Sequence, residues 1–274
     1  MKPLDEQTVL ITGATSGLGR ELAQALAERG SSLLLHGRDA ESGQEMVHRI
    51  KEATGNDQIR FYWADLSSLS EVAELAGEIS VPRLDVLVNN AGVGFGKDPS
   101  KRELSRDGYE LRFAVNYLAP YLLTERLLPL LRASAPARVV NVASVGQAPI
   151  DFDDIMLVGG YDGVTAYRKS KLAMIAWTFN LAARLAGSGV TVNALHPASL
   201  MPTKMVLESG WQTMSSVEEG LKATLRLVVD PALETVTGEY FDGLSLAKAN
   251  PQAYDEGVQK RLVALSQGFV SRFS

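Results

Sequence analysis

Short apolar runs alternate along the chain with longer stretches in which apolar residues recur every three or four positions. The runs predict buried strands at residues 8–12, 32–36, 59–64, 84–88, 138–142 and 190–195. The stretches between them predict helices at residues 18–28, 40–54, 69–79, 104–131 and 165–185, with a kink at Pro120 in the longest. Further on, the pattern predicts a helix at 217–229, a last strand at 239–241 and a terminal helix from 252 to about 269.

Strands that alternate with helices predict right-handed β–α–β units, and hence an α/β protein whose parallel sheet carries helices on both faces. We expect about seven strands in a doubly wound order. The chain has 274 residues and shows no repeat or linker, so a single domain over residues 1–274 is the simplest interpretation.

The composition excludes several classes of function. The net charge is -5 and no basic block occurs, which argues against nucleic acid or a membrane surface as a partner. There is no cysteine, and the three histidines show no metal-ligand spacing, so we expect no metal. Residues 1–7 are polar and no apolar run reaches membrane-spanning length, from which we expect a cytoplasmic protein.

A glycine-rich loop, residues 12–19, separates the first predicted strand from the first helix. Gly13 permits the sharp turn, Gly17 permits close approach of a ligand, and Gly19 permits tight helix–strand packing. The following helix offers unpaired N–H groups to a phosphate, and Thr15 and Ser16 add hydroxyl donors. The loop therefore predicts phosphate binding, with a tight turn that binds nothing as the alternative.

The second strand ends at Gly37-Arg38-Asp39. In nucleotide-binding folds of this kind an acidic side chain near this place binds the adenosine ribose. Here Gly37 leaves that place empty and Arg38 brings a guanidinium that suits a 2′-phosphate. This favours NADP(H) and leaves NAD(H) open. Alternatively, Arg38 is a solvated loop residue that pairs with Asp39.

Tyr167 and Lys171 lie four residues apart in a predicted helix, so both side chains lie on one face. A tyrosine is a poor base at neutral pH, and an ammonium beside it favours the phenolate. The pair can therefore exchange a proton with an alcohol oxygen. On spacing alone, chance is the simpler explanation of such a pair.

Taken together, these motifs resemble the short-chain dehydrogenase/reductase family up to about residue 205. The glycine loop is followed in order by Asp65-Leu66, Asn89-Asn90-Ala91-Gly92, Asn116, Ser144, Tyr167 with Lys171, and Pro197. Residues 107–110, 134–142, 150–154 and 237–241 are similar to retinol-dehydrogenase-like members. The resemblance implies a Rossmann-like fold, a nicotinamide cofactor and an active site at the carboxyl edge of the sheet.

The resemblance also implies a role for each matching residue. Tyr167 exchanges a proton with the substrate oxygen, Lys171 lowers the pKa of Tyr167 and binds the nicotinamide ribose, Ser144 binds the carbonyl, and Asn116 holds a relay water. The cofactor would be bound by Gly13, Thr15, Ser16, Gly17, Leu18, Gly19, Arg38, Asp65, Leu66, Asn89, Ala91, Gly92, Tyr167, Lys171, Pro197, Leu200 and Thr203. Taken singly, Asn116, Ser144 and Asp65 also fit ordinary structural roles in a helix, at a strand end and at an N-cap.

Two segments depart from the common family pattern and concern the substrate. Ala198 replaces a glycine after Pro197, and the segment to Thr203 is one residue longer. The stretch between Ser144 and Tyr167 is also long and apolar, so we interpret about 145–163 as one wall of the substrate site and about 200–220 as a lid. Met205, Trp211 and their apolar neighbours suit an apolar or bulky substrate, or alternatively form an ordinary helix core.

Three functional hypotheses follow. The first is an NADP(H)-dependent oxidoreductase that interconverts an alcohol and a carbonyl in a small-molecule substrate. The second is a non-catalytic dinucleotide-binding sensor or scaffold, and the third is a reductase of an activated C=C bond. A homo-oligomer, dimer or tetramer, is implied by the resemblance, through the helices at 104–131 and 165–185.

Overall fold

The computed structural model describes residues 1–208 and 210–273. Eight strands form one sheet in the order β3-β2-β1-β4-β5-β6-β7-β8. Their bounds are β1 Thr8–Ile11, β2 Ser32–Gly37, β3 Ile59–Trp63, β4 Val86–Asn89, β5 Ala137–Val142, β6 Val190–His196, β7 Tyr240–Asp242 and β8 Ser245–Leu246. All neighbours pair in parallel except β7 and β8. The predicted doubly wound α/β fold is confirmed.

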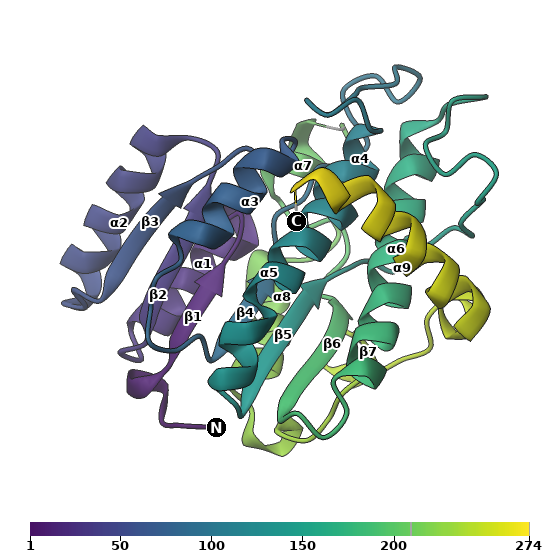
Figure 1. Ribbon diagram of the computed structural model, residues 1–274. Coiled ribbons are helices and arrows are strands. Elements are labelled where there is room, and N and C mark those ends of the chain that lie inside the picture. The colour runs from purple at the N-terminus through teal and green to yellow at the C-terminus, as the bar shows by residue number, and fades with distance from the viewer. Residues whose placement is uncertain (209, 274) are drawn as a thin grey trace.

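The strand residues divide the core between the two faces of the sheet. Val9 and Ile11 belong to one apolar cluster and Leu10 to the other, because successive side chains of a strand point to opposite faces. The helices are α1 Gly17–Ala27, α2 Ala40–Thr54, α3 Leu69–Glu78, α4 Leu111–Phe113, α5 Ala119–Ala133, α6 Gly163–Arg184, α7 Lys204–Glu208, α8 Val217–Val229 and α9 Glu256–Val270. Figure 1 shows α3, α5 and α6 in front of the sheet, with α1 and α8 behind it.

The long helix predicted from residue 104 begins seven residues later. Leu104 instead pairs with Glu110 in an antiparallel bridge, and Gly108 between them takes a left-handed φ of 83°. Glu110 caps α4 by accepting a hydrogen bond from Phe113 N at 2.7 Å. A π-helical turn at Ala114–Leu118 then precedes Pro120, which has no N–H to continue an α-helical pattern. The kink predicted at Pro120 is therefore a π-helical turn.

The C-terminal part adds two features that the apolar pattern did not predict. The chain reverses at Gly243, which has a φ of 57°, and adds the two-residue strand β8, too short to leave a periodic signal. A 3₁₀ turn at Pro251–Tyr254 precedes α9, which Asp255 caps. Figure 1 shows α9, in yellow, lying across α6.

The last helix packs on its own chain. Leu262 and Ser266 of α9 are fully buried, and the Ser266 and Tyr117 hydroxyls share a hydrogen bond of 2.7 Å. Part of the face that the resemblance offers for pairing two copies is therefore covered. Among the described residues, no helix combines the length and the apolar character needed to cross a membrane.

Candidate active site

The loops after β1 and β4 meet at the point where the strand order reverses, which is where open α/β sheets bind ligands. The Thr12 hydroxyl oxygen accepts hydrogen bonds from the Asn90 and Ala91 amides, both at 3.0 Å. The Asn90 side-chain amide donates to the Thr12 and Gly13 carbonyls at 2.8 and 3.1 Å. The segment at residues 89–92 therefore fixes the shape of the glycine loop.

A buried histidine holds the same loop from the other side. Gly13 N donates to His36 Nδ1 at 3.3 Å, and His36 Nε2 lies 3.1 Å from the Ala64 carbonyl. Burial lowers the pKa of His36 to about 4, so the ring is neutral at pH 7. A neutral ring accepts at Nδ1 and donates at Nε2, as both contacts require. Thr12, His36 and Asn90 position the loop, a role that no motif in the sequence predicted.

The glycines of the loop are needed for close approach. A Cβ at Gly19 would collide with the Gly13 carbonyl and lie 2.6 Å from Asn90 Nδ2, and one at Gly13 would lie 2.8 Å from Ala91 Cα. Gly13 and Gly17 take φ values of 66° and 53°, which non-glycine residues rarely adopt. Leu18 is buried under the turn and Ser16 is exposed at its edge. The sequence thus folds here into a cradle of backbone groups.

The N-terminus of α1 differs from the N-termini of the other long helices that begin after a loop. Helices α2, α3, α6, α8 and α9 begin with a side chain that accepts a backbone hydrogen bond, from Asp39, Ser68, Asp162, Ser216 and Asp255 respectively. Ser16, which precedes α1, makes no such bond, and the first turn of α1 carries no acidic residue. The N–H groups of this turn are therefore available to a phosphate.

Arg38 lies exposed at the carboxyl end of β2. The alternative partner, Asp39, is occupied as the N-cap of α2 and accepts from Ser42 N at 2.7 Å. The Trp63 indole donates to the Arg38 carbonyl at 2.7 Å and so ties this turn to the end of β3. A Cβ at Gly37 would lie 2.5 Å from Thr15 Cγ2, which links the same turn to the glycine loop. The turn that carries Arg38 thus lies beside the glycine loop.

Asp65 and Leu66 follow β3 at the same edge of the sheet. Asp65 Oδ1 accepts from Ser67 N at 2.9 Å, and its Oδ2 lies 3.5 Å from Arg106 Nε. Arg106 also pairs with Glu71 at 2.6 Å. Residues 104–110, which were predicted to be helical, therefore contact the predicted adenine pocket through Arg106. Leu66, in the same pocket, is buried.

Tyr167, Lys171 and Ser144 lie near one another, between α6 and the end of β5. Lys171 Nζ lies 5.7 Å from the centroid of the Tyr167 ring and donates to the Val142 carbonyl at 2.8 Å. Ser144 Oγ accepts from Gly146 N at 3.0 Å, and its carbonyl accepts from the Tyr240 hydroxyl at 3.1 Å. The Ser144 side chain lies close enough to the Tyr167 phenol to affect its pKa. One face of α6 thus carries the pair.

The electrostatics of the pair differ from the expectation. Burial raises the pKa of the Tyr167 phenol, and the neighbouring Ser144 hydroxyl acts in the opposite direction. Burial also lowers the pKa of Lys171 to about 8. The sequence predicts that the ammonium lowers the pKa of the phenol, but in this structure Nζ is directed at the Val142 carbonyl and burial dominates.

The buried ammonium gives a stability prediction. Because the folded-state pKa of Lys171 lies near 8, below its ordinary 10.5, the unfolded chain binds more protons between these values. Below pH 8 the buried ammonium therefore lowers the free energy of unfolding by about 3 kcal/mol. This penalty disappears as the pH rises from 8 to 10.5. We expect Lys171→Met to unfold at a higher temperature than wild type at pH 7, with a smaller difference at pH 10.

Thermal unfolding of both proteins at several pH values measures this effect. The matched control is Lys169→Met on the same helix, where the lysine is only partly buried and no comparable gain is expected. A Lys171→Met protein that is less stable than wild type at every pH would contradict the prediction.

Asn116 lies in the π-helical turn and faces the pair. Its Oδ1 accepts from Val93 N at 2.7 Å, and its Nδ2 donates to the Val93 carbonyl and to Ser170 Oγ, both at 3.0 Å. A Cβ at Gly92 would lie 3.2 Å from Asn116 Oδ1 and 3.6 Å from Lys171 Nζ. The side chain thus fixes the segment after β4, and a relay water would bind elsewhere on Asn116, such as its backbone carbonyl.

Asn89 points away from the other predicted cofactor residues. It is buried in the core, where Nδ2 donates to Thr124 Oγ1 at 3.1 Å and to Asn141 Oδ1 at 2.8 Å. Only its backbone is left for a cofactor at the strand end. Ala91 and Gly92, in contrast, lie beside the glycine loop and Lys171 respectively.

The segment after β6 runs alongside the glycine loop. A Cβ at Gly17 would lie 3.0 Å from Thr203 Cγ2, which places Thr203 at the cradle. Leu200 takes a φ of 45°, a left-handed conformation that is unfavourable for leucine, and its carbonyl accepts from Met214 N at 3.1 Å. Thr203 therefore lies beside the glycine loop, in the segment that also carries Pro197 and Leu200.

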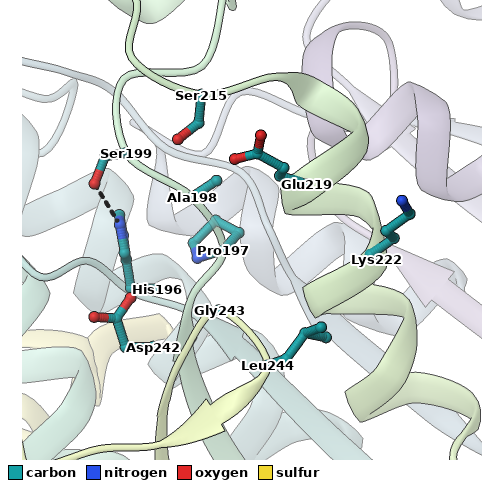
Figure 2. A pocket seen from close by; sticks show the side chains of 10 residues that line it. All are labelled: His196, Pro197, Ala198, Ser199, Ser215, Glu219, Lys222, Asp242, Gly243 and Leu244. Carbon is teal, nitrogen blue, oxygen red and sulfur yellow. Dashed lines mark hydrogen bonds between the residues drawn. The ribbon is translucent and has the colours of Figure 1, made fainter.

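A pocket of about 330 Å³ lies between the segment after β6, helix α8 and the turn after β7 (Figure 2). Figure 2 shows Glu219 and Lys222 projecting from α8 and His196 bonded to Ser199, at 3.0 Å. Burial lowers the pKa of His196, with Asp242 acting in the opposite direction. Of the predicted site residues that the structure describes, only Pro197 lines this pocket. It adjoins the segment at residues 197–203 and is not lined by Tyr167 or Lys171.

The predicted substrate wall is fixed to the protein on several sides. Gln252 exchanges two hydrogen bonds with the backbone of Ile150, at 2.6 and 3.0 Å, and Arg102 donates twice to the Met156 carbonyl, at 3.1 and 2.9 Å. Tyr161 accepts from Arg112 at 2.8 Å. These anchors come from distant parts of the chain and carry no local sequence signal.

Comparisons with known proteins indicate one family. A family model described as short chain dehydrogenase matches residues 7–212. Retinol dehydrogenase 13 of Mus musculus is 38% identical over 276 residues, which cover 93% of this chain and 81% of that protein. An uncharacterized protein from Mycobacterium paratuberculosis has a crystal structure with a TM-score of 0.80 and 29% identity, over 97% of this chain and 94% of that chain. A short chain dehydrogenase from Escherichia coli CFT073, complexed with NADPH, has a TM-score of 0.73 and 28% identity, over 89% of this chain and 98% of that chain.

Proposed function

The chain belongs to the short-chain dehydrogenase/reductase family, and from this we propose that it is an NADP(H)-dependent oxidoreductase that interconverts an alcohol and a carbonyl. The observation that carries the proposal is the placement of Ser144, Tyr167 and Lys171 beside a glycine cradle whose helix begins without a side-chain cap. The neighbour crystallised with NADPH supports the choice of cofactor.

The described residues fit a dinucleotide phosphate. At Gly13, Gly17 and Gly19 a Cβ would collide with a neighbour or strain the backbone, so these glycines leave room for a phosphate. The turn that carries Arg38 lies beside this loop, and Arg38 has no carboxylate partner among the described ion pairs. Arg38 would contact the 2′-phosphate, the N-terminus of α1 the diphosphate, and Lys171 the nicotinamide ribose. When bound, the cofactor supplies or accepts the hydride.

The chain's own residues would handle the proton. In the direction of carbonyl reduction, the Ser144 hydroxyl donates a hydrogen bond to the substrate oxygen, on which negative charge develops. The Tyr167 hydroxyl then donates its proton to that oxygen, and in alcohol oxidation the transfer runs in reverse. A raised pKa keeps Tyr167 protonated at neutral pH, which suits the donor role. Lys171 would return a proton to the phenolate, supplied through Asn116 and water.

We also propose that residues 145–163 and 200–220 enclose an apolar or bulky substrate, within a single domain. The exposed Leu207, Trp211 and Met214 on the lid support this. Pairing of two copies would have to use surfaces that α9 leaves uncovered. A cytoplasmic location stays a prediction.

A fluorescence titration with NADPH, followed by a panel of carbonyls and alcohols read through nicotinamide absorbance, tests the proposal. We expect saturable NADPH binding and turnover of apolar carbonyls. Binding without turnover of any compound would favour the scaffold hypothesis. Products formed with deuterated NADPH decide between the two reductions, because deuterium on the former carbonyl carbon indicates C=O reduction and deuterium on a carbon of the former double bond indicates C=C reduction.

A further inference from the structure

We propose that Phe95 is a positioning residue for Tyr167, and that Trp211, which packs against Phe95, provides the apolar surface against which the substrate lies. The inference rests on the proposed function and assigns a role to two residues outside the catalytic set. The Phe95 ring meets the Tyr167 ring edge-on, with centroids 4.9 Å apart and an interplanar angle of 80°. The Trp211 ring meets Phe95 on the lid side, with centroids 5.0 Å apart and an angle of 39°.

The backbone that carries Phe95 is held on both sides. The Gly94 carbonyl accepts from Arg112 Nε at 3.0 Å, and a Cβ at Gly96 would collide with the Arg112 guanidinium. A Cβ at Gly94 would lie 2.6 Å from Met205 Cγ. The two glycines therefore let the arginine and the lid approach the chain directly before and after Phe95, which leaves the phenylalanine little freedom.

Helix α6 packs against the same segment. A Cβ at Gly163, the first residue of α6, would collide with the Phe95 carbonyl, and Gly163 N donates to the Pro99 carbonyl at 2.7 Å. Tyr167 lies one turn further along this helix. The catalytic tyrosine and the residue that touches its ring are thus fixed to the same rigid element.

The arginine that holds Gly94 is itself locked. Arg112 is buried and pairs with Glu103 at 2.7 Å and with Glu110 at 3.6 Å, and it donates to the Tyr161 hydroxyl at 2.8 Å. Tyr161 in turn donates to Glu110 at 3.0 Å. Breaking a buried charge network of this kind is strongly unfavourable, so the segment keeps one arrangement. The network joins the Phe95 segment to the substrate wall.

The Phe95 and Trp211 rings therefore have different roles. A tyrosine side chain has few staggered rotamers, and a neighbouring ring in edge contact favours one of them. Phe95 thereby keeps the phenol directed toward Ser144, where the substrate oxygen must lie. The Trp211 indole is 45% exposed, so it offers apolar surface on the lid to the part of the substrate beyond the reacting carbon.

Kinetics of four variants test the two roles. We expect Phe95→Ala to lower kcat by about 10-fold to 100-fold, the loss typical of a misplaced catalytic group, with NADPH affinity and KM changed by less than about threefold. Phe95→Tyr keeps the ring and is expected to keep kcat, and Phe95→Leu, which fills most of the volume, guards against a folding defect in the alanine variant. Trp211→Ala is expected to raise KM for apolar substrates about 10-fold with little change in kcat.

A substrate-free measurement keeps this proposal separate from the proposed function. In protein labelled with ¹³C-tyrosine, the Tyr167 resonance is assigned by its absence in Tyr167→Phe. We expect one sharp resonance in wild type and Phe95→Tyr, and a broadened or multiple resonance in Phe95→Ala and Phe95→Leu. An unchanged Tyr167 resonance in Phe95→Ala overturns the positioning role whether or not a substrate is found. Unchanged kcat in that variant, or an equal loss in Phe95→Tyr, overturns it as well.

Discussion

Replacing Tyr167 by phenylalanine is expected to lower kcat by about 10³-fold or more while NADPH binding stays within about twofold of wild type. The substitution removes one hydroxyl and leaves the ring, so the edge contact with Phe95 and the packing of α6 persist. What is lost is the group that gives its proton to the substrate oxygen. Measurement of kcat by NADPH oxidation and of the dissociation constant by fluorescence separates the two effects.

No other described side chain at the site is placed to take over the proton transfer. The Ser144 hydroxyl is too weak an acid near neutral pH, and its oxygen already accepts from Gly146 N. The Lys171 ammonium is directed at the Val142 carbonyl, away from the substrate side of the phenol. The loss in Tyr167→Phe should therefore persist across the pH range of activity.

A tyrosine remote from the site supplies the control. Tyr62 lies on β3 at the edge strand of the sheet, and Tyr62→Phe removes the same hydroxyl with no expected effect on kcat. Wild-type-like turnover in Tyr167→Phe would rule out the proposed mechanism. Loss of NADPH binding together with turnover would instead indicate that the substitution damages the cofactor site.

The sheet and the main site residues were predictable because both leave local signals. Buried parallel strands are continuous apolar runs, and the residues that follow them meet at one edge of the sheet whatever the loops between them do. Gly13 and Ala91 are therefore in contact, as are Gly17 and Thr203, although many residues separate them in sequence. Tyr167 and Lys171 required only the period of a helix.

The failures concern features set by contacts between distant segments. The stretch at 104–110 has a helical distribution of apolar residues, but Gly108 and the Leu104–Glu110 bridge fold it back, and Arg106 then reaches Asp65. The direction of the Lys171 ammonium depends on the Val142 carbonyl, a partner 29 residues away. No periodicity encodes such pairings, and the ring contact between Phe95 and Trp211 is of the same kind.

The proposed preference for NADP(H) depends on Arg38, which forms none of the described ion pairs. Asp39 is committed to the start of α2, and the Trp63 indole holds the Arg38 carbonyl, so the backbone of the turn is fixed while the side chain stays exposed. Gly37 cannot be replaced by an acidic residue without a collision, since its Cβ would lie 2.5 Å from Thr15 and 3.2 Å from Phe61. An acidic side chain at position 37 that would bind the ribose of NAD is thus excluded by packing.

Arg38→Asp is therefore expected to weaken NADPH binding by on the order of 100-fold, because a charge-assisted hydrogen bond is replaced by repulsion between the carboxylate and the 2′-phosphate. NADH binding should change little or improve, since the new carboxylate can accept hydrogen bonds from the ribose hydroxyls. Fluorescence titrations with both dinucleotides give the ratio of the two effects. Arg20→Asp, an equal charge change on exposed α1 beside the same loop, is the matched control and should affect both dinucleotides alike. Equal losses of NADPH and NADH binding in Arg38→Asp would show that the 2′-phosphate is bound elsewhere, because only a contact to that group can distinguish the two dinucleotides.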